Sequence, residues 1–239
     1  MNQPKDKLIA ALDVDSQEEA MAAVGRMDGA LAWVKVGARL FSSTGPSMVT
    51  LLKQQGLKVF LDLKFHDIPA TVASACKNAV ATGADMINVH ALGGRAMMAE
   101  AAAAARNGAK TAGLPPPIVI AVTVLTSMGP EDLIQMGITG TPEELALHLA
   151  REAKAAGLDG VVASAHEVTA IKSANGADFL VVTPGIRPAW ACADDQKRIM
   201  TPVQALRLGA DFLVVGRPIF GAADPKAAAL LTMKEMAEE

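Results

Sequence analysis

The amino-acid sequence predicts an α/β protein folded as one (β/α)8 TIM barrel, a single domain that spans residues 1–239. Eight short apolar runs recur along the chain, mostly about 25 to 35 residues apart, and a stretch with helical periodicity follows each of them. Near-continuous apolar strands are typical of a parallel sheet covered by helices. Eight alternating strand–helix units in one domain of this length favour a closed barrel over an open sheet.

The candidate strands are short, apolar runs rich in β-forming residues. In chain order the strands are LIAALDV (8–14), AWVKVG (32–37), KVFLDLK (58–64), MINVHA (86–91), IVIAVTVL (118–125), GVVASA (160–165), FLVVTPG (179–185) and FLVVGR (212–217).

The segments between these strands are predicted to contain the helices. Several of them end in glycine just before the next strand, as in KQQGLKVF and ATGADMINV, and glycine is the expected left-handed cap of a helix. The alanine-rich stretch AEAAAAARNGAK predicts a short helix, because alanine is the best helix former. Stretches with proline and glycine, such as GLPPP and TPGIRPAWACADDQ, are predicted to be loops.

Composition narrows the class of protein. A formal net charge of −3 gives no reason to expect a nucleic-acid or membrane partner. Two cysteines, Cys76 and Cys192, are too few for a disulfide framework and lack metal-ligand spacing. The first residues lack the apolar core of a signal peptide, and no apolar stretch approaches a spanning length, so we expect a soluble cytoplasmic protein.

Charged residues gather at the ends of the first three predicted strands. In a (β/α)8 barrel the catalytic groups lie at the carboxyl ends of strands and in the loops that follow. Residues two apart in a regular strand point to the same side, so Asp62 and Lys64 are predicted to share a face. If that face is inward, these groups converge at the barrel mouth, with the last of them in the loop before the next helix: Asp13, Lys35, Asp62, Lys64 and Asp67.

Two other interpretations of this cluster stay open at this point. The charges could form a purely structural, paired lining of the barrel top, because a buried charge is costly unless it is paired. A metal site with Asp62, His66 and Asp67 as ligands is also conceivable. The interleaved lysines count against the metal site, because they would repel a divalent cation.

A second cluster follows the seventh and eighth strands, where Gly185 and Arg187 lie in one loop and Gly216 and Arg217 in the other. The loops after these strands often hold phosphate in this fold, and arginine offers a bidentate, permanently charged fork to phosphate oxygens. Gln196, in the long loop between them, could donate from its amide. The sequence therefore predicts a phosphorylated substrate whose phosphate lies here and whose reacting end meets the charged cluster.

The chain also resembles the orotidine 5′-phosphate decarboxylase family over essentially its whole length. The resemblance rests on ALDV with Asp13, VKVG with Lys35, LDLKFHDIPAT (61–71), VLTSM (124–128), TPGIRP (183–188), DDQKRIMTP (194–202) and VVGRPI (214–219).

The resemblance implies decarboxylation of orotidine 5′-phosphate to UMP, the last step of pyrimidine nucleotide synthesis, without a metal or organic cofactor. It assigns Lys35, Asp62, Lys64 and Asp67 to a charged catalytic array, with Lys64 as proton donor and Asp62 near the departing carboxylate. It also implies a homodimer in which Asp67 and Thr71 reach into the partner's site.

The same resemblance implies a set of substrate contacts. Asp13 and Lys35 would contact the ribose, and Thr126 and Ser127 the pyrimidine, with Pro184 and Asp62 also in the substrate-binding set. The phosphate would be held by Arg187, Gln196, Gly216 and Arg217.

Two alternative functions remain. One is a magnesium-dependent enzyme similar to 3-keto-L-gulonate 6-phosphate decarboxylase, of the same suprafamily, which also carries a D-x-K-x-x-D run. The I-P-x-T continuation, Lys35 and the loop with Gln196 favour an orotidine 5′-phosphate decarboxylase over this alternative. The other is a non-catalytic barrel that only binds phosphorylated ligands. The charge array counts against it, because phosphate binding alone does not need Asp62 and Asp67.

Overall fold

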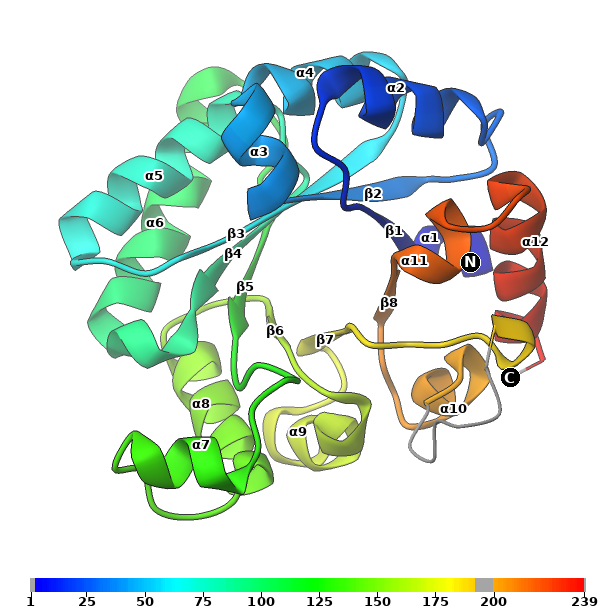
Figure 1. Cartoon of the computed structure of the whole chain (residues 1–239). Helices are drawn as coiled ribbons and strands as arrows, with labels where there is room; N and C mark the ends of the chain where they lie inside the picture. Colours follow the sequence, from blue (N-terminus) through cyan, green and yellow to red (C-terminus); the bar gives the residue numbers. More distant parts are fainter. Residues whose placement is uncertain (1–2, 192–199, 239) are drawn as a thin grey trace.

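Eight parallel strands pair in chain order and close into a barrel, as the sequence predicts (Figure 1). The structure is a computed structural model that describes residues 3–191 and 200–238. The last strand pairs with the first, which closes the sheet. The strands are β1 Leu8–Leu12, β2 Trp33–Gly37, β3 Lys58–Phe65, β4 Met86–His90, β5 Ile118–Val122, β6 Gly160–Val162, β7 Leu180–Thr183 and β8 Phe212–Val215.

The helices form a ring outside this barrel (Figure 1). The α-helices are α1 Pro4–Lys7, α2 Gln17–Gly25, α3 Ala38–Thr44, α4 Ser47–Gln54, α5 Pro69–Ala81, α6 Gly94–Ala112, α7 Pro130–Gln135, α8 Pro142–Ala155, α9 Val168–Asn175, α10 Pro202–Arg207, α11 Arg217–Phe220 and α12 Pro225–Met236. Within the described residues, the short 3-10 turns η1 Ala91–Gly93, η2 Ala165–Glu167 and η3 Ala189–Ala191 lie in loops after strands.

Local sequence signals set several helix boundaries. Pro69 occupies the first turn of α5, where its missing N–H costs nothing. The predicted alanine-rich helix forms the middle of α6. The glycines before β3 and β4, Gly56 and Gly83, have φ of +77° and +85°, the left-handed conformation that ends a helix before the next strand. None of the described helices is both long and apolar enough to cross a membrane.

Strand residues alternate between two buried layers. Outward side chains pack against the helices in one large cluster, as Val34 and Val36 of β2 do. Inward side chains fill the barrel and form a smaller cluster: Ile9, Ala11, Trp33, Phe60, Met86, Ile120, Val182 and Val214. Because this inner cluster fills the barrel below, polar residues of the same strands come together only at its mouth.

Several predicted strands extended too far at their carboxyl ends. β5 ends at Val122 and β6 at Val162, not at residues 125 and 165. The N–H groups of Thr123 and Ala163 still donate to the carbonyls of Val162 and Val182 on the next strands, and the chain then turns away, with Ser164 capping η2. Asp13 likewise lies just beyond β1 instead of inside it. The apolar residues after the strand ends cover the barrel mouth instead of extending the sheet.

Candidate active site

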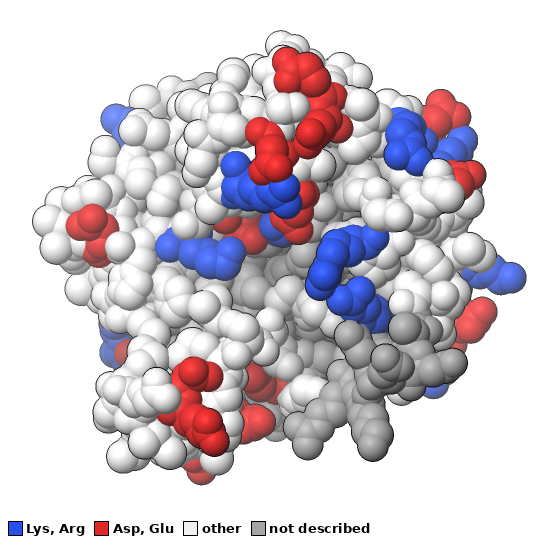
Figure 2. All heavy atoms as spheres, in the orientation of Figure 1, with Lys and Arg blue, Asp and Glu red and all other residues white. Residues whose placement is uncertain are grey.

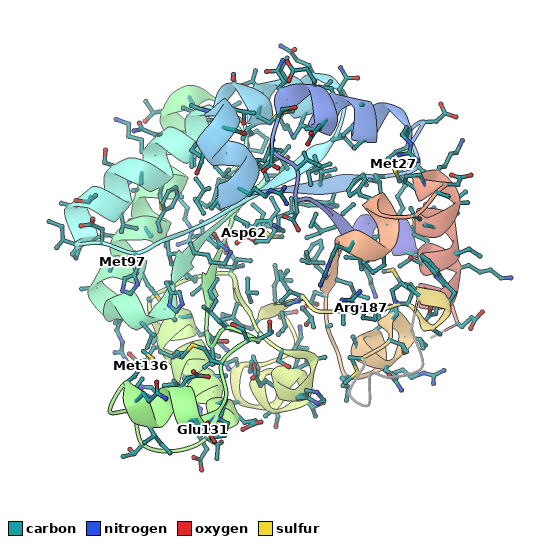
Figure 3. The ribbon with its side chains drawn as sticks, in the orientation of Figure 1. Met27, Asp62, Met97, Glu131, Met136 and Arg187 are labelled. Atoms are coloured by element: carbon teal, nitrogen blue, oxygen red, sulfur yellow. The ribbon has the colours of Figure 1, made fainter. Side chains whose placement is uncertain are left out.

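Two adjoining hollows open at the mouth of the barrel. One has a volume of about 190 Å³ and the other about 230 Å³, and both are lined by Lys35, Pro184 and Val214. Figure 2 shows a central hollow on this face, with basic side chains on opposite sides of it. Asp62 and Arg187 lie on different sides of the opening of the barrel (Figure 3). Residues of both clusters predicted from the sequence therefore line two adjoining hollows that share part of their walls.

The first hollow combines charge with an apolar wall. Asp62, Lys64 and Thr126 line it together with Lys35 and Pro184. The rest of its lining is apolar: Phe60, Val122, Val124, Leu125, Val162, Ala163 and Val214. A planar, weakly polar ring would fit this wall, with the charges at one edge of the ring.

Four of the five predicted charges form a continuous chain. The Nζ of Lys35 lies 3.3 Å from Asp13 Oδ1 and 3.3 Å from Asp62 Oδ2. The Nζ of Lys64 donates to Asp62 Oδ1 at 2.6 Å. Asp62 is thus shared by two ammonium groups that come from two neighbouring strands.

Asp62 is held ionised at this buried position. Its residue is only 9% exposed. Burial alone would raise the pKa of the carboxyl, but the charges of Lys35 and Lys64, with hydrogen bonds from Lys64 and Asn88, outweigh burial and lower that pKa below its usual value. The array is therefore a fixed arrangement of charges that exists before any substrate binds.

Asp62 and Lys64 do meet, but not through the regular strand that the sequence analysis assumed. The pairing of β3 with β4 runs from Leu61↔Ile87 to Phe65↔Val89, so β3 contains a bulge between these pairs. Lys64 itself has a φ of +52°, in the left-handed region that side-chain-bearing residues rarely adopt. The prediction of convergence was right, whereas the assumed cause, two-residue alternation, was wrong.

Asn88 belongs to the array, and the sequence analysis missed it. This fully buried residue of β4 donates from Nδ2 to Asp62 Oδ1 at 2.6 Å and accepts from the Lys64 N–H at 2.8 Å. The available signal was an asparagine inside the otherwise apolar strand MINVHA, since a buried amide needs partners.

Two histidines lie next to the array: His66, which was considered only as a metal ligand, and His90, which the sequence analysis had not singled out. The rings of His66 and His90 stack with centroids 5.4 Å apart. Burial lowers the pKa of His90, and the nearby His66 and Lys64 lower it further.

The second hollow holds the predicted phosphate residues. It is lined by Asp13, Lys35, Pro184, Gly185, Arg187, Gly216 and Arg217, together with Ala11, Ile186, Val214 and Pro218. A Cβ added at Gly216 would lie 3.4 Å from both Ala11 Cβ and Asp13 Oδ2, so a larger side chain would crowd this wall. Gly185 has a φ of +76°, which glycine adopts without strain. Gln196 and Cys192 lie outside the described residues.

Three predicted residues are not gathered into these hollows. Asp67 is exposed, and its carboxylate accepts from the N–H of Ile68 at 2.6 Å rather than joining the charge chain. Thr71 is exposed in the first turn of α5. Ser127 is exposed beside Thr126 but does not line either hollow. The expected role of Asp67 and Thr71 in a partner's site stays a prediction.

The metal alternative finds no cluster to support it. Across residues 3–191 and 200–238, no group of three or more His, Cys, Asp or Glu side chains is arranged to hold a metal ion. Of the three ligands considered, Asp62 contacts two lysines and Asp67 caps a backbone N–H.

Comparisons with known proteins agree on one family. Residues 6–231 match the family model described as "Orotidine 5'-phosphate decarboxylase / HUMPS family". A protein of Syntrophotalea carbinolica named orotidine 5′-phosphate decarboxylase is 51% identical over 233 residues, which cover 98% of this chain and 96% of that protein. A protein of the same name from Legionella pneumophila (strain Paris) is 53% identical over 219 residues, covering 92% and 94%.

Solved structures give the same result. The crystal structure of orotidine 5′-phosphate decarboxylase from Lactobacillus acidophilus matches with a TM-score of 0.83 and 40% sequence identity, over 96% of this chain and 98% of that chain. With the barrel, the charge chain and the two arginines in place, the comparisons show that this chain belongs to the orotidine 5′-phosphate decarboxylase / HUMPS family.

Proposed function

We propose that this protein decarboxylates orotidine 5′-phosphate to UMP and carbon dioxide, the last step of pyrimidine nucleotide biosynthesis. One observation carries the proposal: a preformed Asp13–Lys35–Asp62–Lys64 charge chain lies in the same space as Arg187 and Arg217, in a chain of this family. The substrate is an anion at two ends, a ring carboxylate and a phosphate, and the two clusters lie where these ends would bind.

The two hollows suggest how the nucleotide lies. The phosphate would bind between Arg187 and Arg217, beside Gly216. Lys35 lines both hollows and pairs with Asp13, so these two residues would contact the ribose between phosphate and base. The pyrimidine would lie against the apolar wall with Thr126 at its edge and its carboxylate toward Asp62 and Lys64.

The chemistry follows from an ammonium held beside the reacting carbon. As the bond between ring carbon and carboxylate breaks, its electron pair stays on the ring carbon and carbon dioxide leaves. The ammonium of Lys64 stabilises this developing negative charge and then donates a proton to the carbon, which forms UMP. Asp62 holds both lysines in place, and its charge lies near the carboxylate that departs. No metal or organic cofactor takes part in this scheme.

The active unit in this proposal is a homodimer, with Asp67 and Thr71 entering the partner's site. Asp67 is exposed in the loop just before α5 and Thr71 is exposed in the first turn of α5, and Asp67 takes no part in the charge chain of its own subunit. A role across an interface would explain why the Asp67 carboxylate lies only three residues after Lys64 in the sequence and yet does not contact the charge chain.

The proposed function is tested by following the absorbance of orotidine 5′-phosphate with and without EDTA. The wild-type protein should turn over substrate equally in both conditions, and Lys64→Ala should lose nearly all turnover. Lys226→Ala is the matched control, because this lysine pairs with Asp28 at an exposed position away from the array. Activity that needs added magnesium would favour the alternative sugar-phosphate decarboxylase, and substantial activity of Lys64→Ala would contradict the proton-donor role.

A further inference from the structure

The backbone of Lys64 is held by a side chain of the neighbouring strand. Between the pairs Leu61↔Ile87 and Phe65↔Val89, β3 advances by four residues while β4 advances by two, so the intervening part of β3 leaves the regular ladder. The Lys64 N–H points instead to the side-chain Oδ1 of Asn88, at 2.8 Å. The amide of Asn88 therefore takes the place that a backbone carbonyl fills in an ordinary sheet.

The conformation fixed by this bond is unfavourable by itself. Lys64 has a φ of +52°, and the only other described non-glycine residue with positive φ is Asp28, in an exposed turn. Left-handed backbone at a side-chain-bearing residue persists only where the surroundings hold it, and it is concentrated at functional sites. At Lys64 it directs the ammonium group toward Asp62, at 2.6 Å.

The side-chain amide of Asn88 also holds the carboxylate of Asp62 in place. Asp62 Oδ1 accepts from both Asn88 Nδ2 and Lys64 Nζ, each at 2.6 Å, while Oδ2 lies 3.3 Å from Lys35 Nζ. Rotation of this carboxylate would break its contacts with both lysines. A neutral amide donor prevents that rotation without adding a cation that would compete with Lys35 or Lys64 for the negative charge.

We propose that Asn88 is a positioning residue for the decarboxylation: through its two hydrogen bonds it holds the Lys64 main chain and the Asp62 carboxylate, and so fixes the ammonium group relative to the reacting carbon. This inference rests on the function proposed above. It predicts an effect on turnover with little effect on binding, because Asn88 is not among the residues that line the phosphate hollow.

The test compares two buried asparagines. Asn88→Leu removes both hydrogen bonds at nearly constant volume, and kcat should fall about 100-fold, the scale expected when a reacting group is misplaced by about 1 Å, while KM changes little. Asn175→Leu is the control: Asn175 is 3% exposed and donates to Ile171 within α9, away from the two hollows. It should lower stability while leaving kcat within about twofold of wild type.

A second variant, Asn88→Asp, distinguishes a role of Asn88 in positioning Lys64 and Asp62 from a role in stability alone. The aspartate keeps an acceptor for the Lys64 N–H but places a second carboxyl group beside Asp62. Two acids that share a site do not both ionise easily, so the new carboxyl should titrate at raised pH. Only its protonated form can donate to Asp62 as the amide does. The kcat–pH profile of this variant should therefore gain an ionisation absent from wild type, with activity rising as pH falls.

Crystal structures of the variants give a readout that does not depend on turnover. In Asn88→Leu, Lys64 should relax from positive φ or lose its contact with Asp62. Unchanged geometry in that variant, a kcat within about threefold of wild type, or an Asn88→Asp profile of wild-type shape would each overturn the inference. If Asn88→Leu does not fold, the Asn88→Asp profile decides. A wild-type protein without turnover would refute the proposed function instead, and the variant structures would still test the positioning.

Discussion

At the scale of single residues, Asp62 shows how a buried charge is stabilised here. Removing one partner from a buried charge cluster costs more than the cluster contributes, because the remaining charges lose their compensation. Asp62 pairs with two lysines, so a neutral side chain in its place would leave the charges of Lys35 and Lys64 to repel each other.

We expect Asp62→Asn to lower the free energy of unfolding by about 1–3 kcal/mol at pH 7. The pKa of Asp62 is lowered in the folded protein, so its ionisation stabilises the fold above the unfolded value of about 3.9. That contribution is lost as pH falls through the lowered folded pKa. The difference between wild type and variant should therefore be constant above about pH 4 and shrink below it.

Urea unfolding of both proteins at a series of pH values between neutrality and strong acid measures this difference. Asp28→Asn provides a control, since Asp28 pairs with Lys226 at an exposed position where an ion pair contributes little. A difference that stayed constant through the acid range would contradict the assignment of the effect to Asp62 ionisation.

The sequence predicted most of the site residues but not how they are held. Asp13, Lys35, Asp62 and Lys64 converge as expected, because the barrel brings strand ends to one mouth. The left-handed Lys64 could not be predicted, since a bulge depends on the pairing register between two strands and not on the pattern within one. Asn88 was missed for the same reason: its partners come from the neighbouring strand.

At the scale of elements, the loops after the strands carry most of the proposed function. The glycines and arginines after β7 and β8 come together and line one hollow, while their binding of phosphate stays a prediction. The strand ends were predicted less well, because Val124, Leu125 and Ala163 have the apolar character of strand residues yet line the other hollow. Periodicity cannot distinguish an apolar residue buried in a sheet from one that forms a cavity wall.

The turn η2, directly after β6, contains a buried acid. Glu167 is 7% exposed, and its Oε2 accepts from the N–H of Ser164 at 2.9 Å. Burial raises the pKa of Glu167 to about 7; the Ser164 N–H opposes this shift and the charge of Glu143 adds to it. Glu167 thus loses its proton at lower pH in the unfolded chain than in the folded protein. Its contribution to stability therefore falls as pH rises from about 4 to about 7.

We expect Glu167→Gln to be more stable than wild type at pH 8, by about 2–3 kcal/mol at most, and equally stable near pH 4. Glutamine keeps an acceptor for the Ser164 N–H but cannot ionise. Glu144→Gln is the matched control, because Glu144 caps α8 in the same way from an exposed position. Thermal unfolding of wild type and variants at both pH values measures the difference in stability. An equal gain in stability from Glu167→Gln at pH 4 and pH 8 would contradict the raised pKa of the buried acid as its cause.

For the loop after β8, we expect Arg217→Ala to lower kcat/KM for orotidine 5′-phosphate by about 3–5 kcal/mol, which is roughly 150- to 5,000-fold. The cause is the loss of a charged contact to the phosphate. Orotidine, which lacks the phosphate, supplies the control: wild type and variant should process it at similar rates. A similar loss on both substrates would mean that Arg217 supports the site generally and does not bind phosphate.

At the scale of the whole molecule, the barrel gathers residues from seven strands at one mouth but leaves part of the predicted array outside it. The lining of the two hollows comes from β1, β2, β3, β5, β6, β7 and β8 or from the loops that follow them. Asp67 lies in the loop just before α5 and Thr71 in its first turn, and both side chains are exposed. Sequence spacing placed Asp67 in one cluster with Asp62, whereas the fold separates the two.

Complementation between inactive chains tests whether Asp67 acts across a dimer. Lys64→Ala and Asp67→Ala homodimers should each be inactive. If each site combines Lys64 of one chain with Asp67 of the other, a mixed dimer has one site with both substitutions and one site with neither. Random mixing of equal amounts makes half of the dimers mixed, so about a quarter of the wild-type activity should return. If Asp67 acted within its own chain, every site in the mixed dimer would carry one substitution and activity would stay absent.

Differently tagged chains, unfolded and refolded together, allow the mixed dimer to be isolated, so that its formation is established before its activity is measured.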